Sequence, residues 1–452
     1  DLRLLRNKIA LRRRTGGEDA GWHLKMQKTL GQRIEIREPL GDEDAGVPEP
    51  LRKLLTAHVR DRELGRVARL QTKRRVHRLL APNGAPVAEV ADDDVRAETL
   101  DATTQWRELE AELVGEGDDA LLAAVGQRLL DAGARPAEAP SKIARALAGR
   151  LPPPEAAPAV DSSSTAGEAI AAYLREQGDA RIGLDASVRM DVQDAVHKMR
   201  VAARRLRSAL ATYRRLLDRD VTEPLRGELK WLGGVLGPVR DAEVIRDHLR
   251  TELDEQADEL VVGPVRQRLD GTLGGEHGTA HEQALVELSS PRYLALLDSL
   301  ERVTDAIGGG RAGKKAPKVL AKEVGRAHRR MNRILDQALA SPGPEDHLLH
   351  EVRKAAKRAR YAGESAAPVL GAEATALAER MEEGQEVLGA HQDSVVVRDL
   401  LRRLGADADA AGEPSFTYGR LHALEERRGD EATAQFLEMA DDGWADPPSW
   451  LR

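Results

Sequence analysis

The chain has 452 residues, of which 32% are charged and only 3% aromatic, and its formal net charge at pH 7 is −7. It contains no cysteine, which excludes disulfides, thiolate metal sites and cysteine nucleophiles. No apolar run reaches the roughly 18 residues that a membrane span needs, and the N-terminus shows no signal-peptide pattern, so a cytoplasmic protein without a membrane partner is expected. Because single hydrophobic cores stop growing at roughly 250–300 residues, the length predicts more than one domain.

The first part of the chain has the period-2 alternation of antiparallel strands. The alternation is clearest over residues 67–80, 85–95 and 105–115, and the sequence APNG at 81–84 predicts a hairpin turn. Helical periodicity follows at about 119–150. Residues 151–165 are rich in Pro, Ala and Ser and have no periodicity, which predicts a linker. We therefore expect a strand-rich domain over residues 1–150.

The sequence beyond the linker is helical in pattern, and we expect an all-α domain over 166–440 with a short tail over 441–452. This region contains an internal repeat. HKMRVAARRLR at 197–207 recurs as HEVRKAAKRAR at 350–360, and LGPVRDAEVIRD at 236–247 recurs as LGAHQDSVVVRD at 388–399. The two copies are displaced by 153 residues at the first motif (350 against 197) and by 152 at the second (388 against 236). The repeat predicts a duplicated helical unit with pseudo-two-fold symmetry.

Each copy of the first motif predicts a helix with an apolar stripe on one side and basic residues on the other. Solvated helices usually mix charges, because like charges one turn apart are destabilising, yet almost nothing pairs locally here. Two interpretations stay open. The acidic partners come from other helices, or the two basic faces line a groove in which Arg, Lys and His hold a linear chain of phosphates.

Nucleic acid is the competing polyanion. Proteins that bind single strands usually provide aromatic stacking platforms, but this chain has two Phe, five Tyr and five Trp. No helix-turn-helix or zinc-finger pattern is present, and the negative net charge would repel a long duplex outside a local groove. The residue types therefore favour phosphate without bases, although they leave nucleic acid open as a partner.

The two motifs resemble the repeats of the CHAD family, the conserved histidine α-helical domain. Each of its repeats carries an H-x-x-R-x-x-x-R/K-R-x-R helix followed by an L-G-x-x-x-D segment, and the resemblance covers about 166–440. It implies binding of inorganic polyphosphate by the basic residues. The implied ligands are His197, Arg200, Arg204, Arg205 and Arg207, their counterparts His350, Arg353, Lys357, Arg358 and Arg360, and Arg240 beside the second motif. Asp241 and Asp393 are expected to orient neighbouring arginines.

The predicted strands carry charge at alternate positions. Glu108 and Glu110 alternate with apolar residues, while Lys73 aligns with Arg75. One interpretation is a sheet with one face in water. The other is a closed sheet in which glutamates hold Mg²⁺ or Mn²⁺ and basic residues clamp phosphate oxygens, as metal-assisted phosphoryl transfer requires.

This half of the chain resembles the CYTH domain, the triphosphate tunnel metalloenzyme fold, some members of which hydrolyse tripolyphosphate or thiamine triphosphate. The resemblance covers roughly 1–150 and implies an antiparallel β-tunnel or barrel. It implies phosphate binding by Arg12, Arg14, Lys25, Lys73 and Arg75, and Mg²⁺ or Mn²⁺ binding by Glu35, Glu89, Asp93, Glu108 and Glu110; Lys142 also matches. Two features depart from the family. The E-x-E-x-K strand has no counterpart, so we expect it upstream of residue 1, and Arg37 stands where some members have Glu.

The sequence thus predicts an α+β protein of two domains, a β-tunnel followed by a duplicated helical bundle, that binds inorganic polyphosphate and locates to the cytoplasm, at polyphosphate granules. Hydrolysis of tripolyphosphate or another small triphosphate depends on the upstream strand. Two alternatives stay open. One is a metal-dependent triphosphatase anchored to polyphosphate, and the other is a basic scaffold for RNA or an acidic protein.

Overall fold

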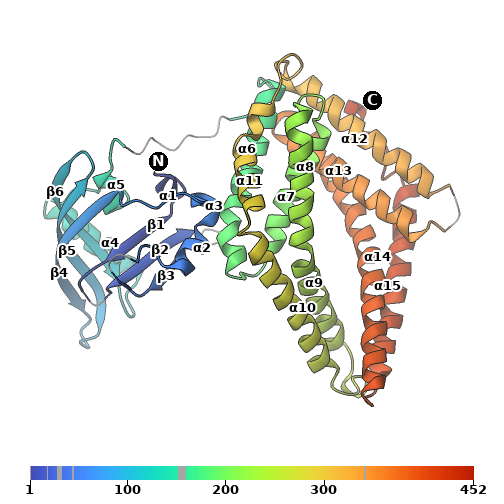
Figure 1. The fold of residues 1–452 in the computed structure, drawn as a ribbon, viewed down its shortest axis with the longest axis horizontal. Helices are drawn as coiled ribbons and strands as arrows, with labels where there is room; N and C mark the ends of the chain where they lie inside the picture. The colour runs from blue at the N-terminus through green and yellow to red at the C-terminus, as the bar shows by residue number, and fades with distance from the viewer. Residues whose placement is uncertain are drawn as a thin grey trace. The chain divides into compact units, whose positions relative to one another are not determined.

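The structure is a computed structural model that describes residues 2–17, 19–27, 33–42, 45–150, 159–340 and 343–451. Within these ranges the chain divides into a strand-rich unit and a helical unit (Figure 1). Residues 49–60 cluster with the helical unit, although the sequence analysis assigned them to the first domain. The predicted linker lies largely outside the described residues, which resume at 159.

The strand-rich unit contains two three-stranded antiparallel sheets, with the strands of each in chain order. The first sheet follows the short helix α1 (Arg3–Arg6) and is formed by β1 (Ala10–Arg14), β2 (Gly21–Gln27) and β3 (Arg33–Glu38). The second is formed by β4 (Ala68–Leu80), β5 (Pro86–Thr99) and β6 (Thr103–Leu113), and the helices α4 (Asp119–Asp131) and α5 (Lys142–Ala146) follow it. The three predicted strands and the predicted hairpin turn are confirmed, and β5 continues past its predicted end.

The predicted β-tunnel or barrel is wrong for the part of the chain that the structure describes, because neither sheet closes. Closure requires every strand to pair on both sides, whereas β1, β3, β4 and β6 each have one paired edge and no ladder joins the two sheets in that part. Strand lengths differ as well. The strands of the first sheet have 5 to 7 residues and those of the second have 11 to 14, so their edges do not match.

The helical unit confirms the predicted all-α region. Its helices in chain order are α2 (Glu49–Leu54), α3 (Thr56–Val59), α6 (Ala166–Arg189), α7 (Ala195–Thr212), α8 (Arg219–Val235), α9 (Gly237–Asp254), α10 (Val265–Glu287), α11 (Pro291–Glu301), α12 (Ala316–Ala338), α13 (Asp346–Leu370), α14 (Ala372–Ala410) and α15 (Phe416–Asp441), with 3-10 turns η2 (Asp258–Leu260), η3 (Val303–Ala306) and η4 (Ser449–Leu451). In the described part of the chain, no helix combines the length and apolar character that crossing a membrane requires.

The internal repeat appears as two helix pairs that differ at one point. α7 and α13 carry the histidine motif, and the L-G-x-x-x-D motif follows in α8–α9 and in α14. In the first copy only Leu236 separates α8 from α9, whereas α14 runs unbroken for 39 residues through Gly389. Pro238 accounts for the break, because proline lacks the amide hydrogen and its ring clashes with the carbonyl four residues earlier. The second copy has Ala390 at the equivalent position.

The helical unit has two separate apolar clusters. The larger one buries the inward faces of α6, α7, α12 and α13, with residues such as Met199, Leu206, Val352 and Ala356 fully buried. The smaller one joins the α9–α10 and α14–α15 hairpins, which extend away from the other helices and meet at their far ends (Figure 1). The break between the two clusters falls between Val239 and Leu249 along α9 and between Leu388 and Val397 along α14.

The short helices α2 and α3 pack on α6. Leu51, Leu55 and Ala57 are almost completely buried, and Ala57 belongs to the larger apolar cluster. Arg60 follows α3, and its side chain is 2% exposed where its Nη1 donates to Glu301 Oε2 at 3.0 Å and also pairs with Asp298. A segment that lies between strands in the sequence is therefore built into the helical unit.

Candidate functional site

The two histidine-motif helices lie against each other across the repeat. The buried Tyr213 hydroxyl and Ser365 hydroxyl are 2.7 Å apart, which joins the end of the first motif segment to α13. Arg358 Nη2 donates to the Ala211 carbonyl at 2.8 Å. These contacts fix α13 beside α7, so the two basic faces predicted from the sequence are brought together.

The second motif orients the first arginine of each histidine motif. Arg200 Nη1 donates to the Gly237 carbonyl at 2.7 Å and to Asp241 Oδ1 at 3.1 Å. The expectation that Asp241 orients an arginine is confirmed by this ion pair. In the second copy Arg353 lies over Gly389, where an added Cβ atom would come within 3.0 Å of Nη2. The absence of a side chain in L-G-x-x-x-D thus gives the guanidinium room against the helix backbone.

Arg204 and Lys357 occupy equivalent positions of the two repeats and lie close together. Burial, followed by the charges of Arg353 and Arg204, lowers the pKa of Lys357 to about 7, while Asp393 opposes the change. Among the described residues neither side chain has an acidic ion-pair partner, and Arg204 Nε is buried without a hydrogen bond. Two half-buried cations therefore lie close together, and Asp393 only partly offsets the effect of the arginines on Lys357. We call Arg200, Arg204, Arg353 and Lys357 the paired-repeat cluster.

Positive charge continues from this cluster along α7. Burial lowers the pKa of His197, and the charges of Arg240 and Arg204 add to the effect. Burial also lowers the pKa of Arg207, with Arg226 and then Arg204 as the next causes. Arg204 is thus electrostatically coupled to the cations on both sides of it.

Arg226 of α8 was not a candidate in the sequence analysis. Its charge lowers the pKa of Arg207 and that of Arg358, which falls to about 10 mainly through burial and through Arg330. Arg226 lies outside both repeated motifs, and its own acidic neighbour Glu223, three residues earlier, gives it the sequence pattern of an ordinary helix-surface pair. Only the packing of α8 against α7 reveals its place.

Two of the predicted ligands are instead compensated by carboxylates. Arg205 Nε donates to Glu364 at 2.9 Å, and Arg360 Nε donates to the other oxygen of Glu364 at 2.8 Å. Arg360 also pairs with Glu382 at 2.7 Å, and both guanidinium groups lie within 6 Å of the Tyr361 ring centre. These two arginines thus differ from the paired-repeat cluster, in which the cations outnumber nearby acids.

The other predicted ligands lie at the ends of the basic face. The pKa of His350 is lowered by burial and then by Lys354, and its buried Nδ1 has no hydrogen-bond partner within the described ranges. Arg240 donates to Glu243 at 3.1 Å and lies 3.6 Å from Asp194. A pocket of about 560 Å³ between α9, α10 and α14 adjoins the cluster, because Asp241, the partner of Arg200, lines it together with Gln283 and Arg403.

In the strand-rich unit, the register of the second sheet separates the predicted residues onto two faces. Lys73 and Arg75 lie opposite Asp94 and Asp92, whereas Arg74 lies opposite Asp93, which in turn lies opposite Glu108. Side chains of directly opposite residues point to the same face. The basic residue that shares a face with the predicted metal ligands is therefore Arg74, which donates to both oxygens of Asp93 at 2.7 and 2.8 Å. The pairing register, which the alternation of charge alone does not give, is the signal that would have identified it.

Three predicted metal ligands converge on Lys142. Its Nζ lies 2.7 Å from Glu108, 2.7 Å from Glu110 and 3.1 Å from Asp93. Burial alone would lower the pKa of Lys142. The hydrogen bonds that its ammonium group donates to these carboxylates more than offset that effect, so the pKa of Lys142 is raised overall. The ammonium group thus occupies the point where a divalent ion would sit. The residues in this arrangement do not fit Mg²⁺ or Mn²⁺ unless Lys142 is displaced, and we derive no chemical step through an ion.

The remaining predicted residues of this unit form local ion pairs. Glu35 accepts from His23 at 2.7 Å and lies 3.2 Å from Lys25, and the His23 hydrogen bond is the largest cause that lowers the pKa of Glu35 to about 2. Glu89 pairs with Arg78. Arg12 and Arg14 share one face of the first sheet, Arg14 pairs with Asp19, and the pKa of Arg12 is lowered by burial and by Arg14.

Comparisons with known proteins identify the repeated helices. A family model described as the CHAD domain matches residues 172–402. Two uncharacterized proteins of Mycobacterium tuberculosis, MT2285 of strain CDC 1551 / Oshkosh and Rv2226 of strain H37Rv, are each 38% identical over 462 residues, covering 97% of this chain and 86% of the relative.

Two solved structures are similar in fold. The CHAD domain from the plant Ricinus communis is 24% identical with a TM-score of 0.50, covering 67% of this chain and 99% of that chain. PptA from Streptomyces chartreusis is 24% identical with a TM-score of 0.49, covering 62% of this chain and 100% of that chain.

Proposed function

The chain belongs to the CHAD domain family, and we propose that its helical unit binds inorganic polyphosphate at the paired-repeat cluster. CHAD domains are linked to polyphosphate binding. The observation that carries the proposal for this chain is the meeting of Arg204 and Lys357, two cations from equivalent positions that form no ion pair with a carboxylate among the residues the structure describes. Recruitment to polyphosphate granules would follow from such binding, and imaging of the labelled chain beside stained granules tests it.

The cations of the cluster outnumber the acidic groups near them, Asp241 and Asp393. Burial and the charges of Arg353 and Arg204 disfavour the protonated form of Lys357. Phosphate oxygens between these side chains would reverse this penalty, since charge-assisted hydrogen bonds to phosphate are the strong ones. The cations of α7 follow one another every three or four residues, a spacing of about 5 Å per turn, which suits a linear ligand with a charge on each unit.

The contacts of Tyr361 favour phosphate over nucleic acid. Single-stranded nucleic acid is usually held by aromatic rings on which bases stack. The Tyr361 ring of α13 is 6% exposed and already lies beside the guanidinium groups of Arg205 and Arg360. The cluster therefore offers charge without an adjacent free stacking surface.

The experiment is a titration of the full chain with long-chain polyphosphate, RNA and DNA at matched phosphate concentration and salt. Lys357→Gln should weaken polyphosphate binding about tenfold to a hundredfold, because a hydrogen bond to a charged group contributes about 1.5–3 kcal/mol. Lys354→Gln is the matched control, since Lys354 lies on the same helix, is 56% exposed and pairs with Glu351. Equal losses in the two variants, or equal affinity for all three polymers, would contradict the proposal.

A second candidate function is hydrolysis of tripolyphosphate or another small triphosphate by a CYTH-like strand-rich unit. The observation that favours it is the convergence of Asp93, Glu108 and Glu110 on one point, where a metal ion would have to displace the Lys142 ammonium group. The test is phosphate release from tripolyphosphate with Mg²⁺ or Mn²⁺, compared with Glu108→Gln. Release that requires the metal and disappears in the variant supports hydrolysis, and no release from any triphosphate opposes it.

A further inference from the structure

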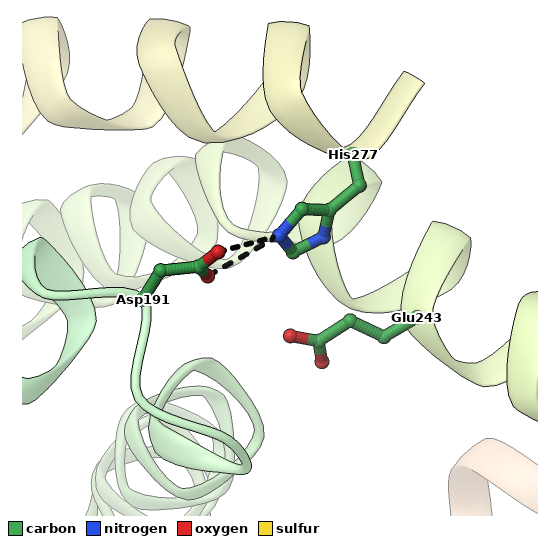
Figure 2. A group of neighbouring side chains, drawn as sticks. All are labelled: Asp191, Glu243 and His277. Atoms are coloured by element: carbon green, nitrogen blue, oxygen red, sulfur yellow. Dashed lines mark hydrogen bonds and ion pairs between the residues drawn. The ribbon is translucent and has the colours of Figure 1, made fainter. Parts of the chain in front are cut away.

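A second group of chemically active side chains lies outside the paired-repeat cluster. Asp191 follows the end of α6, Glu243 belongs to α9 and His277 belongs to α10. One nitrogen or oxygen atom from each of the three lies within 4.8 Å of the other two, and Figure 2 shows the side chains pointing toward one another. Neither repeated motif includes Asp191 or His277, and the proposed function does not use them.

The distances suit a shared ion. His277 Nε2 lies 3.1 and 3.2 Å from the two carboxylate oxygens of Asp191 (Figure 2). Atoms that bind one ion at about 2.0–2.2 Å lie roughly 3–3.5 Å apart, so this pair already has the spacing of two ligands. The Glu243 and His277 side chains are each 12% exposed and that of Asp191 is 47% exposed. The group is thus buried on the protein side and open to solvent at Asp191, which gives an ion a way in.

A second histidine supports the arrangement from the next turn of α10. The sequence HGTAH places His277 and His281 four residues apart on one helical face. Their rings are nearly parallel, with centres 6.1 Å apart. His281 Nε2 donates to the Val188 carbonyl at 2.8 Å and lies 3.9 Å from Asp191. His281 therefore positions the segment that carries Asp191, the role that outer partners have around bound metals.

The charges around Glu243 leave one oxygen for an ion. Arg240 donates to its Oε2 at 3.1 Å, and in the described part of the chain no donor to Oε1 is found. His248, Glu252 and Glu425 form a similar group, but there the Arg428 guanidinium lies 2.7 Å from His248 Nε2 and 3.4 Å from Glu425. A fixed cation thus already occupies that group, whereas Arg240 reaches the first group from one side only.

We propose that Asp191, Glu243 and His277 bind one divalent transition-metal ion of the Zn²⁺ class, with water completing its coordination. One imidazole and two carboxylates form a mixed nitrogen and oxygen set, which suits Zn²⁺ or Mn²⁺, while Mg²⁺ prefers oxygen ligands alone. The ion joins the end of α6 to the α9–α10 hairpin. It lies beside Arg240 at the end of the basic face, and none of its three ligands belongs to the paired-repeat cluster.

The test is titration of the metal-stripped full chain with Zn²⁺, Mn²⁺ and Mg²⁺ separately, with binding followed by calorimetry and by the melting temperature. The wild-type chain should bind the first equivalent of Zn²⁺ more tightly than any further equivalent of Zn²⁺. His277→Ala should lose that equivalent, and His281→Asn should weaken it about tenfold to a hundredfold, as outer-partner substitutions do. Co²⁺ should give an absorption band that His277→Ala lacks.

His347→Ala is the control, because His347 is a histidine with a 68% exposed side chain that pairs with nearby Glu345 at 3.1 Å. It should leave the tight equivalent unchanged. If His277→Ala unfolds, Glu243→Gln replaces it, since that change keeps the size of the side chain. The proposal is overturned if the tightly bound Zn²⁺ persists in His277→Ala or Glu243→Gln, or if His347→Ala removes it. It is also overturned if Mg²⁺ binds as tightly as Zn²⁺.

Discussion

Two lysines, one in each unit, show opposite electrostatic states. Lys142 donates to three carboxylates within 3.1 Å, and its pKa is raised despite burial. Lys357 is surrounded by arginines, and burial together with Arg353 and Arg204 lowers its pKa to about 7. Lys142 lies among predicted metal ligands, and Lys357 lies among predicted phosphate ligands. The first cluster satisfies its own charges, and the second leaves its charges for a ligand to satisfy.

This contrast changes how a basic segment is interpreted. The number of positive residues does not distinguish a site from a solvated face, because Arg205 and Arg360 belong to the same motifs as Arg204 yet pair with Glu364. What distinguishes Arg204 from them is that, in the described part of the chain, no carboxylate forms an ion pair with it. Replacing Lys142 and Lys357 in turn tests this difference between the two clusters most directly.

The largest expected effect is on stability. Lys142→Met should destabilise the strand-rich unit by about 3 kcal/mol, because it removes the cation that three carboxylates share and leaves Arg74 as the partner of Asp93 and Glu110. Lys357→Met should stabilise the ligand-free helical unit by about 1 kcal/mol, because it removes a buried charge next to arginines. Urea unfolding of the full chain measures both changes, with the two units followed separately by hydrogen exchange.

Lys73→Met serves as the control for Lys142→Met. Lys73 is exposed on the opposite face of the same sheet, so its loss should change the free energy of unfolding by less than about 0.5 kcal/mol. If Lys142→Met and Lys357→Met shift stability in the same direction, the contrast between the two clusters is wrong.

A smaller effect is expected from pH. In the ligand-free chain Lys357 loses its proton as pH rises through about 7, so binding of polyphosphate above that pH must also take up a proton. The affinity should fall about tenfold between pH 6 and 8, since one proton per binding event gives tenfold per pH unit above the pKa. Lys357→Arg should remove this dependence, and titrations at the two pH values check it.

Stability of the ligand-free chain should move the other way. The unfolded chain keeps Lys357 protonated up to its ordinary pKa of 10.5, whereas the folded chain releases that proton near 7. Between these values the unfolded state binds more protons, so this group makes folding more favourable as pH rises.

A wild-type affinity for polyphosphate that does not change between pH 6 and 8 would contradict the lowered pKa of Lys357.

The smallest expected effect concerns the glycine of the L-G-x-x-x-D motif and tests whether it gives space to an arginine. Gly389→Ala places a Cβ atom 3.0 Å from Arg353 Nη2 and should weaken polyphosphate binding a few-fold by displacing the guanidinium. Gly237→Ala is the matched control, because its Cβ atom would lie 3.9 Å from Arg200 Nη1, an ordinary contact. Alanine favours helix over glycine by about 1 kcal/mol, so the Gly389 variant should lose affinity without losing stability. Equal affinities of the two variants would show that Arg353 does not need this space.

The sequence predicted the features that depend on periodicity. The strands β4, β5 and β6 and the repeat in α7 and α13 follow from alternation and from two matching motifs. It did not predict which charges meet, because Glu364 lies in α13 between the repeated residues and the helix end and shows no pattern of its own. The pairing of Arg74 with Asp93 could not be predicted, because it depends on the register between β4 and β5. The open sheets could not be predicted either, because composition does not encode which strand edges stay unpaired.

The packing of α2 and α3 on α6 bears on how the protein can be dissected. A fragment that begins at residue 166 has the complete histidine motifs, yet it lacks Ala57 of the larger apolar cluster and Arg60, the buried cation between Asp298 and Glu301. Such a fragment exposes apolar surface on α6 and leaves two carboxylates in mutual repulsion. Limited proteolysis and truncation at the linker therefore do not isolate the helical unit intact, and residues 49–60 must accompany it, joined or added in trans.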